Sequence, residues 1–203
     1  MNFQSNWPMN TKTTSPVLIN RNREKLLNCI IYFLLNTKNC GKTKLFKLLY
    51  FLDFFHFKET GKSVTGLHYN AWQLGPVPVE LFHEFEKPQD DFKKCINIIG
   101  EVTPDGFFKM LPRCKFDNRY FSKREMRLLG KVAYIFKEAK TEDIVEVSHL
   151  PNMPWDKTIK TKGEYAEIDF LLALDESKES LSLEEAIERM IEIREVQSLF
   201  NND

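Results

Sequence analysis

Apolar residues recur with a helical period in two long stretches near the start of the chain. In residues 20–36 they return every three or four positions, which predicts a helix ended by Asn39-Cys40-Gly41. Residues 42–60 are apolar on nearly every side, so they predict a helix buried at the centre of the protein and ended by Gly61. Asp53 is the exception within that second helix.

The pattern then becomes extended and is interrupted by turn residues. Residues 67–74 predict a short strand, in which Tyr69 and Trp72 lie on opposite faces. Gly75-Pro76 ends that strand. Pro78 suits the first turn of a third helix, because its φ is fixed and it has no N–H.

Turn and capping signals organise the second half of the chain. Residues 95–102 and 107–111 flank Pro104-Asp105-Gly106 and predict a β-hairpin. Ser122-x-x-Glu125 is a capping box that opens a helix to about residue 140, and residues 141–149 predict a short helix after it.

The last third of the chain is less regular until its end. Pro151, Pro154 and Trp155 predict an irregular stretch, and residues 168–175 match neither period clearly. Ser182-x-x-Glu185 opens a final amphipathic helix. Its expected apolar side is Leu183, Ala186, Ile187, Met190 and Ile191, and its expected acidic side is Glu184, Glu188, Glu192 and Glu195.

Together these elements predict a mostly helical α+β single domain with a small antiparallel β-sheet or hairpin. We expect residues 1–19 to form a flexible N-terminal arm, residues 20–175 to form the domain, and residues 176–203 to form an acidic amphipathic C-terminal helix.

Composition places the chain among ordinary globular proteins. It has 203 residues, 42% of them apolar and 29% charged, which is enough for one core without a disulfide or a metal. None of the four cysteines is in a CxxC pair, so reduced thiols and a cytoplasmic location are expected. No apolar stretch is long enough for a membrane span, so no membrane partner is expected.

Charge is unevenly distributed although its sum is zero. Residues 1–163 carry 26 Lys and Arg against 17 Asp and Glu, a net +9, whereas residues 164–203 carry 3 against 12, a net −9. Two interpretations remain open. In the first, the charge division has a role: the acidic end docks on the basic body, or the basic body binds an acidic partner. In the second, the basic and acidic parts are simply solvated faces of one domain.

Motifs for catalysis or cofactor binding are nearly absent. Gly41-Lys42-Thr43 resembles the tail of a phosphate-binding loop, but position 36 is Asn and a helix precedes the motif. Asp53 and His56 share a helix face and could orient a base, although a buried carboxylate more often holds a backbone or basic group in place. We expect no metal, cofactor or enzymatic activity. The clustered Lys42, Lys44 and Lys47 give little support for nucleic-acid binding, because lysines at a helix start usually keep their amines in solvent.

Two groups of motifs resemble a known family in their order and spacing. The first is Lys47-Leu-Leu-Tyr-Phe-Leu-Asp53, then Thr60-Gly61, Val64-Thr65-Gly66, Tyr69-x-Ala71 and Gly75-Pro-Val-Pro78; the second is Ser148-His149 before Pro154-Trp155. They resemble the Panacea domain, also called the SocA-like antitoxin domain, over roughly residues 20–175. Leu52, Phe82 and Asn152 depart from the residues common in that family.

The resemblance implies an antitoxin of a bacterial or prophage toxin–antitoxin pair, which neutralises its toxin by direct contact. The partner expected from it is therefore a cognate toxin protein. Taken with the helix and strand patterns, the family-signature or partner-binding candidates are Asp53, His56, Tyr69, Trp72, Gly75, Pro76, Pro78, His149 and Trp155.

Two alternatives remain open. The charge-split C-terminal helix could be the docking element of an adaptor that delivers a partner to a protease. The basic body, with Asp53 and His56, is the only support for an enzyme or a DNA-binding autoregulator.

Overall fold

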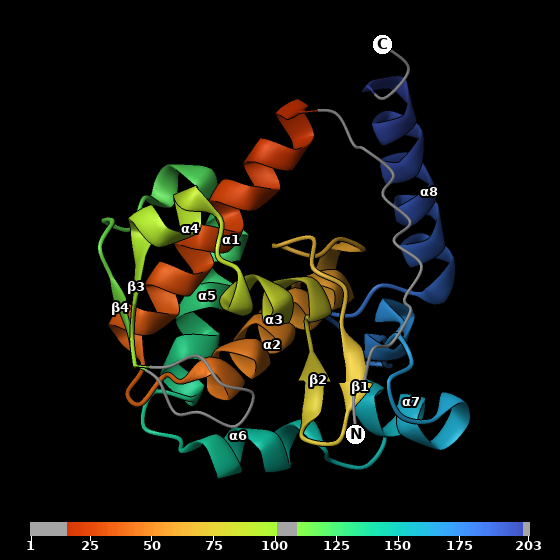
Figure 1. The fold of residues 1–203 in the computed structure, drawn as a ribbon. Coiled ribbons are helices and arrows are strands. Elements are labelled where there is room, and N and C mark those ends of the chain that lie inside the picture. Colours follow the sequence, from red (N-terminus) through yellow and green to blue (C-terminus); the bar gives the residue numbers. More distant parts are fainter. Residues whose placement is uncertain (1–15, 101–108, 201–203) are drawn as a thin grey trace, which may run out of the picture.

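The computed structural model describes residues 16–100 and 109–200. Within these ranges the chain forms eight α-helices, two 3₁₀ helices and two antiparallel two-stranded sheets. This is the mostly helical α+β single domain that the sequence predicts (Figure 1). No helix in the described part of the chain is long and apolar enough to cross a membrane.

Helix α2 (Lys42–Thr60) runs through the centre of the molecule, with the other elements arranged around it (Figure 1). Its bounds are those predicted, and its buried residues occupy all sides of the helix. Gly61 ends it in the left-handed conformation, where its N–H donates to the carbonyl of Phe57. Helix α1 (Pro16–Asn36) packs beside α2 and begins four residues before the predicted start; the predicted arm up to residue 15 lies outside the described residues.

Strands β1 (Asn70–Trp72) and β2 (Gly75–Val77) form a hairpin against α2. Their register pairs Ala71 with Pro76, and an isolated bridge to Glu167 extends the other edge of β1. Helix α3 (Val79–Glu86) follows, with Pro78 at its N-cap rather than in its first turn.

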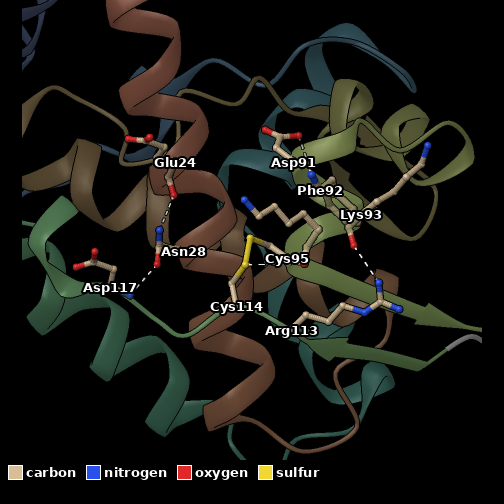
Figure 2. Close-up of a disulfide and its surroundings, with 10 residues drawn as sticks. Glu24, Asn28, Asp91, Phe92, Lys93, Cys95, Arg113, Cys114 and Asp117 are labelled. Atoms are coloured by element: carbon tan, nitrogen blue, oxygen red, sulfur yellow. Dashed lines mark hydrogen bonds between the residues drawn. A yellow bond between two sulfur atoms is a disulfide. The ribbon is translucent and has the colours of Figure 1, made fainter.

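A short helix, α4 (Asp90–Cys95), which was not predicted, leads into the second hairpin. Strands β3 (Ile96–Ile99) and β4 (Lys109–Pro112) confirm the predicted pairing, although the predicted turn lies outside the described residues. Cys95 and Cys114 form a disulfide at the open end of this hairpin, with their Cα atoms 4.7 Å apart (Figure 2).

The expectation of four reduced thiols is therefore wrong for Cys95 and Cys114, while Cys29 and Cys40 remain free. The hairpin register, not a sequence motif, brings the pair together. The N–H of Arg113 donates to the carbonyl of Cys95 at 2.7 Å, so Cys114, the residue after Arg113, lies beside Cys95.

Capping boxes open the later helices as predicted. Helix α5 (Lys123–Ile135) has the Ser122–Glu125 box and ends five residues earlier than expected. A 3₁₀ helix (Asn118–Tyr120) precedes it. Helix α6 is Thr141–Ser148. The expected irregular stretch at Pro154 is instead helix α7 (Pro154–Lys162), because a proline fits the first helical position.

The segment from residue 170 into the last helix packs across α2. A 3₁₀ helix (Phe170–Ala173) fills the segment with no clear period, and helix α8 (Leu183–Phe200) follows the predicted Ser182–Glu185 box. Figure 1 shows α8 at one side of the molecule, with its C-terminal half extending past the body. Of its predicted apolar side, only Ala186 is fully buried.

Candidate functional site

Asp53 is the centre of the first cluster of signature residues. It lies on α2 without exposed surface, and its Oδ1 accepts the N–H groups of Val64 and Thr65, each at 2.8 Å. Its Oδ2 accepts the hydroxyl of Tyr69 at 2.7 Å and that of Thr65. Burial raises the pKa of Asp53, and the hydrogen bonds offset part of that rise. The carboxylate thus holds the loop after α2 in place, as its structural interpretation predicts.

His56 does not join Asp53 in a relay. Its Nδ1 lies 2.6 Å from the carbonyl oxygen of Lys62, which only accepts, so Nδ1 carries the proton there. The hydroxyl of Thr60 lies 3.2 Å from the same nitrogen. Burial lowers the pKa of His56. Its partners are therefore those of a second structural tie at the end of α2.

Tyr69 and Trp72 lie on opposite sides of their segment, as predicted. Tyr69 is fully buried at Asp53, whereas Trp72 is half-buried and its ring packs on Phe82, with centroids 4.9 Å apart. The carbonyl of Trp72 accepts the indole N–H of Trp155 at 2.9 Å. That bond fixes α7 to the first hairpin.

Gly75 is the centre of the second cluster, in which β2 meets α2 and the end of α6. Its φ of +93° favours glycine, and a Cβ there would lie 2.7 Å from Ser148 Oγ, 2.8 Å from Lys47 Cε and 3.0 Å from His149 Nε2. The ring of His149 stacks on Trp155, with centroids 3.8 Å apart and planes 12° apart. We call Gly75, Lys47, Ser148, His149 and Trp155 the elbow cluster.

Lys47 is the residue of this cluster that sequence reasoning misjudged. It was expected to keep its amine in solvent, but it is fully buried, and its Nζ donates to the carbonyl of Pro76 at 2.9 Å. Lys44 is also buried and donates to the carbonyls of Lys38 and Ala139. The signal available in the sequence was their position on a helix that is otherwise apolar all round.

Electrostatics in the elbow cluster favour neutral groups. Burial lowers the pKa of Lys47 to about 7. Burial and then the charge of Lys47 lower the pKa of His149, whose Nε2 is buried without a hydrogen-bond partner among the described residues. The hydroxyl of Ser148 donates to the carbonyl of Val145 at 2.7 Å, so it is not oriented by His149.

The arrangement therefore lacks the chain of contacts that activates a nucleophile. A serine next to a histidine needs the histidine as its hydrogen-bond acceptor and a third group to orient the ring. In the parts of the chain that the structure describes, no three His, Cys, Asp or Glu side chains gather as a metal site. The structure brings most of the predicted residues into two groups. Asp53 and Tyr69 meet in the first group. The second group is formed at the elbow by Trp72, Gly75, Pro76, His149 and Trp155, whereas His56 and Pro78 belong to neither.

Three large apolar side chains are exposed beside the elbow cluster. Leu74 precedes Gly75, Leu150 follows His149, and Tyr165 packs its ring on Trp72; their exposed fractions are 63%, 47% and 60%. Tyr165 has a φ of +64°, which is uncommon for a bulky residue, and its N–H donates to the carbonyl of Ala71 at 2.8 Å. We call these three exposed residues the elbow rim.

The comparisons with known proteins agree with the motifs. The sequence model of the family described as antitoxin SocA-like, Panacea domain, matches residues 45–156, a span that holds both clusters. No curated protein and no solved structure matches this chain. The family match covers more than half of the chain, and the protein accordingly belongs to the SocA-like antitoxin family with a Panacea domain.

Proposed function

We propose that this protein is the antitoxin of a bacterial or prophage toxin–antitoxin pair, and that it neutralises its toxin by binding it directly. The family match over residues 45–156 is the observation that carries this proposal. A cytoplasmic location is part of this proposal and rests on the family match alone, because the Cys95–Cys114 disulfide removes the argument from reduced thiols.

The use of the signature residues supports binding over catalysis. The Asp53 carboxylate is occupied by backbone and hydroxyl donors, and the amine of Lys47 is occupied by a carbonyl. Polar groups held in this way stabilise one fold rather than act on a substrate.

Co-expression with the product of the adjacent gene tests the proposal. We expect the neighbour alone to arrest growth, the wild-type chain to restore it, and the two proteins to co-purify. A neighbour that is harmless alone, or that remains toxic beside soluble wild-type chain, contradicts the proposal.

Ser148→Ala is the control that separates binding from catalysis. The change removes only the hydroxyl that donates to Val145, so the fold should remain. Neutralisation should therefore equal that of the wild type. A soluble Ser148→Ala chain that still binds the neighbour but no longer restores growth would indicate chemistry at the elbow cluster.

A further inference from the structure

We propose that the exposed apolar side of α8 is the surface on which the toxin docks, and that the matching toxin surface is apolar with basic margins. This inference rests on the proposed antitoxin function. We call Leu183, Ile187 and Ile191 the α8 stripe.

Among the described residues, the start of α8 is anchored to the body. The N–H of Leu181 donates to the carbonyl of Lys58 at 2.9 Å, just before the helix. Ala186 is fully buried, and α8 crosses α2 so closely that a Cβ on Gly61 would lie 2.7 Å from Arg189 Cβ. Beyond this crossing the helix extends past the body (Figure 1). The crossing fixes the first half of the helix, which carries the α8 stripe, and therefore holds the stripe in one position before a partner binds.

The α8 stripe is large, apolar and exposed. Leu183, Ile187 and Ile191 are spaced four residues apart, so they lie along the same side of the helix. Their exposed fractions are 52%, 40% and 48%, and Met190 and Ile193 beside them are only half-buried. Single exposed aliphatic residues are common, but a continuous row on an amphipathic helix indicates an interaction face.

Charge along the stripe selects the partner. The helix carries five glutamates and two arginines, a net −3. Among the described residues, the ion pair of α8 is internal, between Arg189 and Glu192, and Glu184, Glu188 and Glu195 enter none. The basic body of this chain therefore does not neutralise them, and a surface with Lys or Arg beside an apolar ridge would.

A second copy of the chain is a poorer occupant than such a toxin. Pairing two α8 helices would bring ten glutamates and four arginines together, a net −6. Like charges at an interface oppose association, and a basic partner meets the same apolar stripe without that repulsion.

Binding and neutralisation by full-length variants test the inference. The adjacent gene product serves as the toxin once the wild-type chain has been shown to neutralise it. A stripe variant carries Leu183→Ser, Ile187→Ser and Ile191→Ser, and a charge variant carries Glu184→Lys, Glu188→Lys and Glu195→Lys. We expect the stripe variant to weaken toxin affinity about 30-fold or more. The charge variant should weaken affinity at low salt, with a smaller loss at high salt.

Matched controls keep the result specific. Tyr134→Ser removes a side chain that is 83% exposed on α5, and Leu74→Ser with Tyr165→Ser alters the elbow rim. Both should bind the toxin as the wild type does, and all variants should keep the circular dichroism spectrum of the wild type. A loss of binding in the elbow-rim variant, with none in the stripe variant, would overturn the inference and place docking at the elbow.

Two further outcomes would also overturn it. If sedimentation shows a wild-type dimer that the stripe variant dissociates, while toxin affinity is unchanged, the stripe is a self-association surface. If the stripe variant binds toxin normally but lengthens toxin half-life in cells, α8 docks on a protease system instead. A wild-type chain that neutralises nothing contradicts the proposed function itself, and is therefore distinguishable from either outcome.

Discussion

A buried lysine without a buried carboxylate partner is the least expected residue of this protein. The amine of Lys47 has one carbonyl acceptor, Pro76, and lies near His149 and Ser148. Transfer of its charge from water costs more than one hydrogen bond returns, which is why burial lowers its pKa to about 7. Asp53, the buried carboxylate of α2, has by contrast four hydrogen bonds from three residues.

Lys47 should make the protein more stable as the pH rises from 7 to 8.5. In that range the unfolded chain, with a lysine pKa near 10.4, still binds the proton that the folded chain releases. The free energy of unfolding contributed by this group therefore increases by up to about 2 kcal/mol. Below pH 7 both states are protonated, so its contribution stays at its lowest.

Lys47→Met supplies the comparison. The variant keeps a similar volume and loses the titrating group, so its urea-unfolding free energy should exceed that of the wild type at pH 6 and the difference should shrink by pH 8.5. Burial and the charge of Lys47 lower the pKa of His149, so its titration lies further from the range of pH 7 to 8.5 than that of an ordinary histidine. An unchanged difference between the two proteins across the range would show that the amine is not buried.

At the scale of elements, the elbow between the first hairpin and α3 depends on one glycine. Gly75 combines a left-handed φ with the close approach of Ser148, Lys47 and His149. It lets β2 contact α2 and the end of α6 at the same point. The signature motif is thus explained as a packing requirement where β2, α2 and the end of α6 meet.

Gly75→Ala and Gly163→Ala separate strain from contact. Both positions have a left-handed φ, but a Cβ at Gly163 meets no atom within 4 Å. We expect Gly163→Ala to cost about 2 kcal/mol of unfolding free energy through backbone strain alone, and Gly75→Ala about 4 kcal/mol because a steric clash is added to its backbone strain. Urea unfolding at pH 7 measures both. Equal losses of unfolding free energy in the two variants would mean that the backbone around Gly75 shifts to make room for the added Cβ.

At the scale of the whole molecule, the charge division of the chain persists in space. Among the described residues no glutamate of α8 pairs with the body, so the self-docking interpretation receives no ion pair from the helix. The acidic end is tied to the body before α8, where Asp175 pairs with Lys58. Residues 176–203 carry 8 acidic and 3 basic residues, a net −5, and their removal leaves +5. Through its contribution to the net charge, the acidic helix therefore weakens the attraction of the whole protein to polyanions.

Heparin chromatography checks this conclusion. A chain that ends at residue 175 should elute at higher salt than the full chain. A full-length variant with the five glutamates of α8 changed to Gln has the same +5 charge and should elute with it. If the truncated chain elutes later than the Gln variant, α8 shields a basic surface after all.

Much of the fold could be predicted from local pattern. The bounds of α2, the second hairpin and both capping boxes follow from periodicity and turn chemistry, which act over a few residues. Strand β2 was missed, because Gly75-Pro76 was expected to end a strand and instead begins the one that pairs with β1. Helix α4 was missed because it is short and polar. Helix α7 was missed because prolines that usually signal a break stand where a helix begins.

The sequence by itself determined the family, the central helix and the residues of the signature, because these depend on residue type and local spacing. Tertiary structure alone decided what those residues do. It joined Cys95 to Cys114 through hairpin register, buried Lys47 beneath Gly75, separated His56 from Asp53, and left most of the apolar side of α8 uncovered. Each of these outcomes depends on which distant segments meet in space, and the order of residues along one segment carries no record of that.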